Sequence, residues 1–421
     1  MTSVIFRYIC GMTRKILLLL HITVLLRLTP SHGQSSAGTL DIVSWNIEFF
    51  GAAYNSGPPD KDLQEANVKS ILSWLNADLY GLIEVVDTMR LRRVVDFLGN
   101  QEYGFVVAPY CSGNTSGTGN GWLSGQKQAY IYRKSIFTNV TTRGMQRNST
   151  TAYTNWASGR FPYLFSATAT INGISRNMNF MLLHGKAGNT EADYLKRAGA
   201  AIELKDTLDA FFPSTLNLII GDFNDALHTS IYTGASVSSY YSIVSDSTDA
   251  DHYRSITLPL GVAGQSSMIN FPNVIDNHVI SNEVYPYYIR NSARVRTDVV
   301  SIVPDYVSAH NTSDHYPVFS QYNLAGVVTG IQPVSPQQMG IRISPNPFSD
   351  HIMLTAYRPQ HRLQVRLYST DGKLLVETTR SFLQQGSLLD IPVKPLATGM
   401  YLLEISTPKE RTAIKLIHQQ P

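Results

Sequence analysis

Acidic, amide and imidazole side chains stand at the ends of apolar, strand-like runs in the first three quarters of the sequence. Removing a carboxylate from water beside such a run is costly unless the group is paired or bound to a cation, so these positions indicate a functional role. The side chains concerned are Asn46, Glu48, Glu84, His184, Asp222, Asn224, Asp276, Asp314 and His315. A single Gly-Asp-x-Asn or Ser-Asp-His sequence is also typical of a turn or a helix cap. Their joint occurrence predicts one shared site.

Most of these side chains offer only oxygen atoms as ligands. Oxygen ligands without thiolates suit Mg²⁺, with Mn²⁺ or Ca²⁺ as alternatives, rather than zinc. The two histidines, His184 and His315, titrate near neutral pH and are suited to donate and accept protons. A metal that polarises a phosphoryl oxygen, with a base for water and an acid for the leaving group, is sufficient to hydrolyse a phosphate ester.

Strand-like and helix-like segments that position these groups alternate between residues 40 and 324. Apolar residues on one stripe predict helices at Asp60–Asn76 and Ala192–Phe212, the second with Leu195, Ile202 and Leu208 on its buried side. Strands are expected at Thr39–Phe50, Asp78–Val85, Ala129–Arg133, Tyr163–Ile171, Ser175–Leu183, Leu216–Ile220, Val274–Ile280, Val299–Val303 and Pro317–Tyr322. Strands interleaved with covering helices indicate an α/β body of layered sheets.

The two ends of the chain have a different texture from this body. Ile16–Leu26 is an apolar run after Arg14 and Lys15, which predicts a secretory signal peptide over residues 1–33. A membrane anchor is the weaker alternative, because a span takes about 20 residues, and we expect the mature protein to have no stable membrane span. Residues 325–340 are typical of a linker, and the short alternating strands of residues 341–421 predict a small β-sandwich.

The charge of the body argues against simple attraction of nucleic acid. The whole chain carries a net charge of +3, but residues 34–340 contain 20 Lys and Arg against 25 Asp and Glu. A mildly acidic body does not recruit polyanions through its net field. Either the substrate is small, or local groups and bound cations offset the repulsion.

In their order along the chain, the motifs resemble the endonuclease/exonuclease/phosphatase superfamily, which has the deoxyribonuclease I-like fold. The resemblance extends from Thr39 to Tyr322 and rests on the sequences SWNIEFFG, LIEV, LLHGKAG, LIIGDFND, VIDNHVIS and SDHYPVF. It implies a four-layer α/β/β/α sandwich with the site at one edge of two packed sheets. It also implies that Glu84 binds the divalent metal with help from Asn46 and Glu48, and that Asp314 is a metal ligand or a partner of the histidines.

The same resemblance implies catalytic roles for the remaining groups. Asp222 and Asn224 would hold the attacking water and the phosphate. His315 would be the general base, oriented by Asp276, and His184 the proton donor or a phosphate ligand; the division between the two histidines stays open. Arg160 matches a position where relatives place an arginine before Pro and a strand. It would clamp the phosphate, unless it is a surface arginine at a strand start.

Other residues depart from the family pattern or match no motif. Glu48 stands where many relatives have Asp, and Asn277 where relatives often have Arg or His, which leaves one fewer cation near the phosphate. His278 matches no motif and is expected to be either a surface residue or one satisfied by hydrogen bonds. The Gly-rich loop Cys111–Gly125, with Trp122, is either a substrate contact or a mobile loop.

The carboxy-terminal residues resemble the sorting domain of the type IX secretion pathway of Bacteroidetes. The matching segments are SPNPFSD at Ser344–Asp350, VRLYSTDGKLL at Val365–Leu375, LATGMYLLEI at Leu396–Ile405 and the terminal KLI. The resemblance implies passage across the outer membrane through the type IX machinery, followed by release or surface attachment. A carbohydrate-binding sandwich is the weaker alternative.

Together these observations predict a secreted, divalent-metal-dependent phosphoesterase. An endonuclease acting on nucleic acid leads within that class. A sphingomyelinase-like lipid phosphodiesterase and a small phosphate monoesterase are the alternatives. A non-catalytic surface-binding protein is a further one, although such a protein would be expected to lose a metal-binding acid or a histidine, and this chain retains them.

Overall fold

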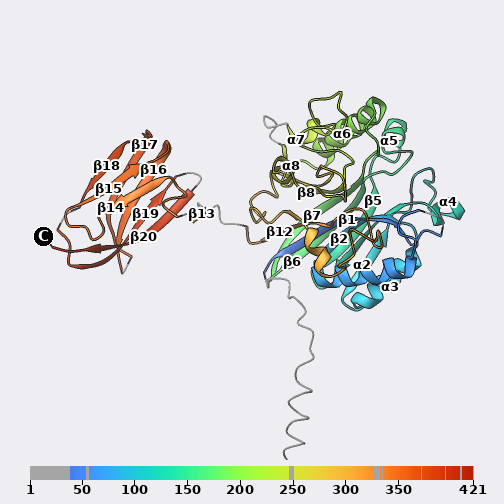
Figure 1. Ribbon diagram of the computed structural model, residues 1–421, viewed down its shortest axis with the longest axis horizontal. Coiled ribbons are helices and arrows are strands. Elements are labelled where there is room, and N and C mark those ends of the chain that lie inside the picture. The colour runs from blue at the N-terminus through green and yellow to red at the C-terminus, as the bar shows by residue number, and fades with distance from the viewer. Residues whose placement is uncertain are drawn as a thin grey trace, which may run out of the picture. The chain divides into compact units, whose positions relative to one another are not determined.

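The computed structural model describes residues 38–53, 56–245, 251–326, 332–333, 335–370, 372–393, 395–407 and 410–420. The contacts divide the chain into two units, the first ending at Leu324 and the second beginning at Ala325 (Figure 1). The predicted signal peptide lies outside the described residues, and so does part of the predicted linker. Among the residues described, no helix combines the length and apolar character needed to cross a bilayer.

The first unit contains two six-stranded mixed sheets. The first sheet has the order β11 (Arg294–Val295), β12 (Val318–Tyr322), β1 (Leu40–Phe50), β2 (Leu79–Val85), β4 (Lys127–Arg133) and β3 (Tyr103–Val107). The second has the order β5 (Phe137–Gly144), β6 (Tyr163–Ile171), β7 (Ile174–His184), β8 (Leu216–Asp222), β10 (Asp276–Ser281) and β9 (Tyr253–Ser255). Within them β1 and β2 run parallel, and so do β7 and β8.

Helices cover the outer face of each sheet (Figure 1). On the first sheet, α2 (Lys61–Leu75) and α3 (Thr88–Leu98) share an apolar core with strand residues such as Trp45 and Tyr80. On the second, α6 (Glu191–Phe211) packs beside the short α5 (Thr150–Asn155) and α7 (Tyr241–Val244). Two further short helices are α4 (Gly119–Leu123) and α8 (Leu258–Val262).

The inner faces of the two sheets pack against each other without a spacer. A Cβ atom on Gly81 of β2 would lie 2.8 Å from Leu182 of β7 and 3.1 Å from Ile220 of β8, so the absence of a side chain there allows the close approach. Ile42, Leu182 and Ile220 belong to one buried cluster. The layers are therefore helix, sheet, sheet and helix, which confirms the predicted α/β/β/α sandwich.

Local signals in the sequence fix where the main helices begin and end. Asp60 accepts hydrogen bonds from the amides of Asp62 and Leu63 and so caps α2, which ends at Asn76 in the left-handed conformation. Thr190 and Asp193 form a reciprocal capping box at the start of α6.

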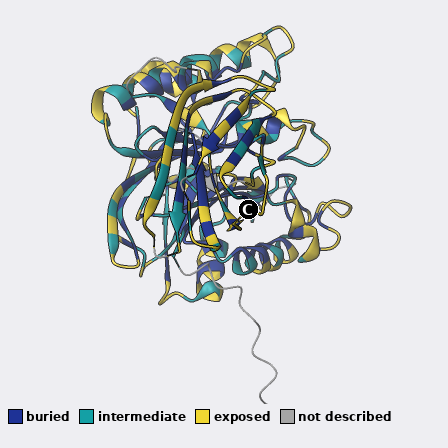
Figure 2. Ribbon diagram, turned by 90° about the vertical axis from the view of Figure 1, so that its left-hand side faces the viewer, coloured by how far each residue is buried: buried dark blue, intermediate teal, exposed yellow. Residues whose placement is uncertain are grey.

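Burial is concentrated on the strands, and exposed positions lie along the outer sides of the helices (Figure 2).

Two predicted details are wrong. The segment expected as a strand at Val299–Val303 is a 3-10 helix, Thr297–Ser301. No described strand pairs with it, and its backbone amides bond carbonyls three residues earlier. Its valines Val299 and Val303 pack on the first sheet. In α6, Leu195 and Ile202 are 58% and 52% exposed, whereas Arg197 is fully buried.

The second unit is a β-sandwich of its own. Its five-stranded sheet has the order β13 (Gln332–Pro333), β20 (Glu410–His418), β19 (Gly399–Ser406), β16 (Gln360–Ser369) and β17 (Leu374–Leu383). Its three-stranded sheet has the order β14 (Ile341–Ser344), β15 (His351–Ala356) and β18 (Leu388–Pro392). Alternate residues of both sheets, such as Ile352, Leu354, Val365 and Leu367, enclose one apolar core. The predicted small β-sandwich is confirmed.

Candidate active site

The predicted site residues gather where strands of both sheets end. Asp222, the last residue of β8, pairs in register with His184 at the end of β7 and with Asp276 at the start of β10. In the other sheet, Asn46 lies near the end of β1, and Glu84 lies near the end of the neighbouring parallel strand β2. Because residues in register lie side by side, the sheets themselves bring these side chains together.

The amide of Asn46 joins the two sheets at this edge. Its Nδ2 donates to Glu84 Oε1 at 3.3 Å and to Asp222 Oδ2 at 3.1 Å, and its Oδ1 accepts the Glu48 amide at 3.0 Å. The other oxygen of Glu84 accepts the Phe49 amide at 3.0 Å. Glu48, Phe49 and Glu84 all have positive φ, between 40° and 65°. Such backbone strain is concentrated at functional sites, and here it turns the chain so that these polar groups converge.

The two bridged carboxylates are deeply buried, Glu84 at 9% and Asp222 at 1% exposure. Burial raises the pKa of Glu84. Burial, followed by the neighbouring charge of Asp276, raises the pKa of Asp222. Carboxylates in this position favour either a proton or a bound cation.

His315 is held by the carboxylate of Asp276, which flanks Asp222 on the side away from His184. Its Nδ1 lies 2.7 Å from Asp276 Oδ2, which also accepts the hydroxyl of Ser267 at 2.8 Å. The backbone carbonyl of His315 accepts hydrogen bonds from the Trp45 indole at 2.9 Å and from the Tyr306 hydroxyl, so the main chain of His315 is held as well as its ring. Burial opposes the charged ring, but the carboxylates of Asp276, Asp222 and Asp314 outweigh it and raise the pKa of His315 well above its ordinary value.

His184 has the opposite character. Burial, with the charges of Arg160 and His315, lowers its pKa well below the ordinary value. Arg160 is 8% exposed, so it is no surface arginine; its guanidinium lies 2.9 Å from His184 Nε2 and donates to the Gly185 carbonyl at 2.7 Å. Its Nε is buried and has no hydrogen-bond partner. His184 Nε2 is also 3.5 Å from Glu84 Oε1, which places the arginine and the imidazole beside the carboxylates.

Asn224 lies beside Asp222 in a turn with φ of 50°. Its backbone amide donates to Asp222 Oδ1 at 2.8 Å, and its side-chain amide donates to the Gly185 carbonyl at 3.3 Å. The loop after β8 is thereby tied to the loop after β7.

Glu48 and Asp314 form a second carboxylate group at the rim. Glu48 Oε2 accepts the Asp314 amide at 2.9 Å, and Asp314 Oδ1 lies 3.8 Å from His315 Nε2. Burial and the charge of Asp314 raise the pKa of Glu48. His310, whose Nε2 lies 2.7 Å from the Glu48 carboxylate, was not identified in the sequence analysis. It stands in a loop outside any strand-end motif, so no sequence signal marks it.

A further network, also missed, supports the site from behind. Asp225 is fully buried and accepts from the amides of Ile231 and Ser239 at 2.7 and 2.9 Å. Arg197 of α6 donates to the carbonyls of Lys186 and Gly188 at 2.8 and 2.7 Å, and its Nε lies 3.8 Å from Asp225. The loops that follow His184 and Asp222 are thus fastened to one buried ion pair.

The donor set of this site suits a divalent cation. Ligand atoms of Asp222, Asp276 and His315 all lie within 4.8 Å of one another. Asp276 Oδ1 is buried without a hydrogen-bond partner, and Asn46 links Glu84 to the same cluster. Buried carboxylates with an unsatisfied oxygen are what a hard cation requires. The residues present therefore fit a divalent metal, but this cluster consists of the predicted catalytic groups. Of the predicted metal ligands, Asn46 and Glu84 adjoin it, whereas Glu48 and Asp314 form the separate group at the rim.

Solved structures that are similar to this chain come from several organisms. A humanized Danio rerio (D. rerio) TDP2 is 14% identical over 68% of this chain and 99% of its own, with a TM-score of 0.46. An endonuclease/exonuclease/phosphatase from Beutenbergia cavernae is 13% identical over 90% and 100%, and the human Nocturnin catalytic domain is 15% identical over 68% and 94%; each has a TM-score of 0.46.

None of the curated proteins matches this sequence. The carboxy-terminal unit does match a known family, over nearly all of its β-sandwich. Proteins that carry this module are secreted or attached to the surface, as the sequence predicts. Residues 342–419 are thus identified as a Secretion system C-terminal sorting domain.

Proposed function

We propose that residues 34–324 form the catalytic domain of a secreted, divalent-metal-dependent phosphoesterase, and that its substrate is a phosphodiester of nucleic acid. The observation that supports this most directly is the bridging of two buried carboxylates, Glu84 and Asp222, by the amide of Asn46. A histidine–aspartate pair stands on one side of them, and an arginine–histidine pair stands on the other. A signal peptide over residues 1–33 and the sorting domain, acting with the type IX machinery, would deliver the protein outside the cell.

In this proposal Asn46, Glu48, Glu84 and Asp314 hold the metal, Mg²⁺ before Mn²⁺ or Ca²⁺. When bound, the cation polarises a phosphoryl oxygen and offsets negative charge in the transition state. The rise in the pKa of Glu84 and Glu48 on burial supports the assignment, because each carboxylate lacks enough positive charge from the protein itself.

The protein's own groups then orient the attack of water. Asp276 accepts a hydrogen bond from Nδ1–H of His315, which leaves Nε2 available to take a proton from water once the ring is neutral. Asp222 and Asn224, joined at 2.8 Å, hold the water and a phosphate oxygen. The carboxylates of Asp276, Asp222 and Asp314 raise the pKa of His315, so a cation held by Asp314 would offset part of that charge and favour the neutral ring.

Arg160 and His184 stand on the opposite side. Arg160 is charged and buried, and its unpartnered Nε supports the proposal that it binds a phosphate oxygen with two of its donors. His184, beside it, is the phosphate ligand or the donor to the leaving oxygen. Its low pKa favours a neutral ring in the absence of substrate, so a negatively charged substrate would have to raise that pKa before the ring donates a proton.

The test uses the mature chain, residues 34–421. Plasmid DNA, RNA, sphingomyelin, bis-p-nitrophenyl phosphate and a phosphate monoester are incubated with Mg²⁺, Mn²⁺ or Ca²⁺, and with EDTA. Nicking of DNA that EDTA abolishes supports the nuclease. Turnover of lipid or monoester alone would redirect the substrate assignment. A folded protein that has no activity on any of these substrates would favour the non-catalytic alternative.

A further inference from the structure

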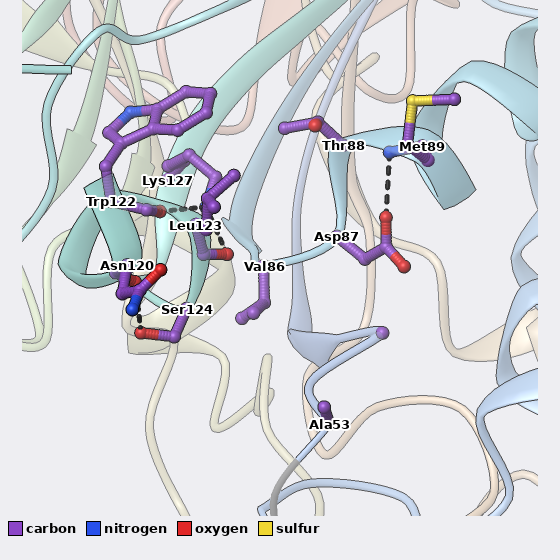
Figure 3. Close-up of a pocket in the computed structure, with 11 residues that line it drawn as sticks. Ala53, Val86, Asp87, Thr88, Met89, Asn120, Trp122, Leu123, Ser124 and Lys127 are labelled. Atoms are coloured by element: carbon purple, nitrogen blue, oxygen red, sulfur yellow. Dashed lines mark hydrogen bonds between the residues drawn. The ribbon is translucent and has the colours of Figure 1, made fainter. Parts of the chain in front are cut away.

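A slot opens beside the catalytic centre, at the ends of β1 and β2. It has a volume of about 410 Å³ and is lined by Gly51, Ala53, Val86, Asp87, Thr88, Met89, Asn120, Trp122, Leu123, Ser124 and Lys127. Figure 3 shows the residues of α4 and its flanks on one wall, and the first residues of α3 on the facing wall. The Gly-rich loop, for which the sequence left substrate contact and a mobile loop as alternatives, thus supplies one wall.

The slot begins two residues along the chain from Glu84, one of the proposed metal ligands. Phe49 donates its amide to Glu84, and the next residue, Phe50, accepts the amides of Val86 and Asp87 at 3.1 and 3.0 Å. Val86, which lines the slot, is two residues from Glu84, a distance of at most about 7 Å along an extended chain. A group esterified to a phosphate at the catalytic centre therefore reaches the slot without a long linker.

The walls carry exposed apolar side chains. Met89 is 60% exposed and Leu123 is 59% exposed, and they stand on facing walls (Figure 3). The indole of Trp122 is fixed, because its Nε1 donates to the Ala108 carbonyl at 3.2 Å. The ammonium of Lys127 lies 4.7 Å from the centre of the same indole. A rigid indole, a thioether and a leucine form the contacts that an aromatic ring prefers.

The charges of the slot do not suit a second phosphate. Lys127 is 1% exposed, and its ammonium donates to the carbonyls of Trp122 and Gly125 at 2.7 Å each, so it holds the wall together instead of facing a ligand. The other charged lining residue is Asp87, which would repel an anion. Asn120 and Ser124 place an amide and a hydroxyl group at the rim. These groups suit the heteroatoms of a ring, whereas an alkyl chain would make no hydrogen bond with them.

We propose that this slot, defined by the eleven lining residues above, binds an uncharged aromatic ring of the substrate, such as a nucleobase, carried on the phosphate that the catalytic centre cleaves. The inference rests on the proposed phosphoesterase function and specifies the group beside the scissile phosphate. Met89, Trp122 and Leu123 contact the faces of the ring, and Asn120 and Ser124 meet its polar edge.

Three esters with the same leaving group test the proposal. They are the p-nitrophenyl phosphodiesters of thymidine (through its 5′ oxygen), methanol and octanol. In the mature chain, Leu123→Asp and Met89→Asp should each lower the ratio of kcat/KM for the thymidine ester to that for the methyl ester by about fivefold or more. The matched control, Leu195→Asp, replaces a leucine that is 58% exposed on α6 and should change neither value.

An unchanged ratio in both slot variants would overturn the proposal. A loss of preference confined to the octyl ester would also overturn it, because the slot would then hold an alkyl chain.

If the wild-type protein cleaves none of the three esters with any metal, the phosphoesterase function fails and the slot is judged by binding alone. Calorimetric titration with thymidine 5′-monophosphate then decides. Binding weakened about fivefold or more by Leu123→Asp supports the slot, and equal affinity or no wild-type binding rejects it.

Discussion

The Nδ1 atom of His315 lies 2.7 Å from the Oδ2 atom of Asp276, and both residues are almost completely buried. In the proposed mechanism this pair determines which nitrogen of the His315 ring faces the substrate. Replacing Asp276 by Asn keeps the size of the side chain but allows the amide to donate to Nδ1, which favours the wrong tautomer. We expect kcat to fall by roughly 10²–10⁴-fold, with little change in Tm.

The matched control for that variant is Asp298→Asn, since Asp298 forms an exposed pair with Arg296 at 2.8 Å. Steady-state kinetics on bis-p-nitrophenyl phosphate measures both variants. An Asp276→Asn protein with the wild-type rate would show that the orientation of His315 is not required.

Replacing Glu84 by Gln should separate metal binding from folding. The Mg²⁺ concentration for half-maximal rate is expected to rise about tenfold or more, because a charged ligand is lost. In EDTA, however, the variant should have a higher Tm than the wild type, because burial disfavours the charged form of Glu84 and raises its pKa. Glu191→Gln, at an exposed position in the first turn of α6, is the control. Equal metal dependence in the variant and the wild type would remove Glu84 from the ligand set.

The buried imidazole of His278 should make the protein sensitive to acid. It lies 3.0 Å from the Ser44 hydroxyl and 2.8 Å from that of Ser320, between the two sheets, so it is a satisfied residue and not a surface one. Burial lowers its pKa from 6.5 to about 3. As pH falls below 6.5 the unfolded chain takes up a proton that the folded one refuses, so stability present above pH 6.5 is lost progressively toward pH 3.

This loss amounts to about 2 kcal/mol at pH 5 for the one group. Urea unfolding at pH 7 and pH 5 should therefore show a smaller difference in His278→Gln than in the wild type. The comparison subtracts the contribution of every other titrating group. Equal differences in the two proteins would mean that His278 is protonated in the folded state.

Replacing Arg160 by Lys keeps the charge but removes the fork of donors. Because the guanidinium contacts both His184 and the Gly185 carbonyl, we expect kcat/KM to fall by roughly 10²-fold. Inhibition by inorganic phosphate should weaken in parallel. Arg92→Lys, at an exposed position of α3, serves as the control. Full activity in Arg160→Lys would show that a point charge is sufficient.

Much of the site could be predicted because it depends on strand ends. A polar residue after a buried run is visible in the sequence, and Asn46, Glu84 and Asp222 are joined by hydrogen bonds at such ends. The layered fold followed from the alternation of strands and helices in the same way.

What the sequence could not show depends on contacts between distant loops. His310 meets Glu48 across 262 positions, and Ser267 reaches Asp276 from a loop with no periodic pattern. Arg197 was hidden for another reason. A helix pattern assigns the inner face by hydrophobicity, which favoured Leu195 and Ile202, whereas the loop carbonyls and Asp225 require a cation at that place.

The pairing of Asp222 with both His184 and Asp276 couples chemistry to strand alignment. Side chains alternate between the two faces of a strand, so a shift of β8 by one residue would point the Asp222 carboxylate toward the helices and bring the hydrogen of Gly221 into its place. An insertion or deletion of one residue in β8 would thus take the Asp222 carboxylate out of the proposed site while most of the backbone ladder re-formed.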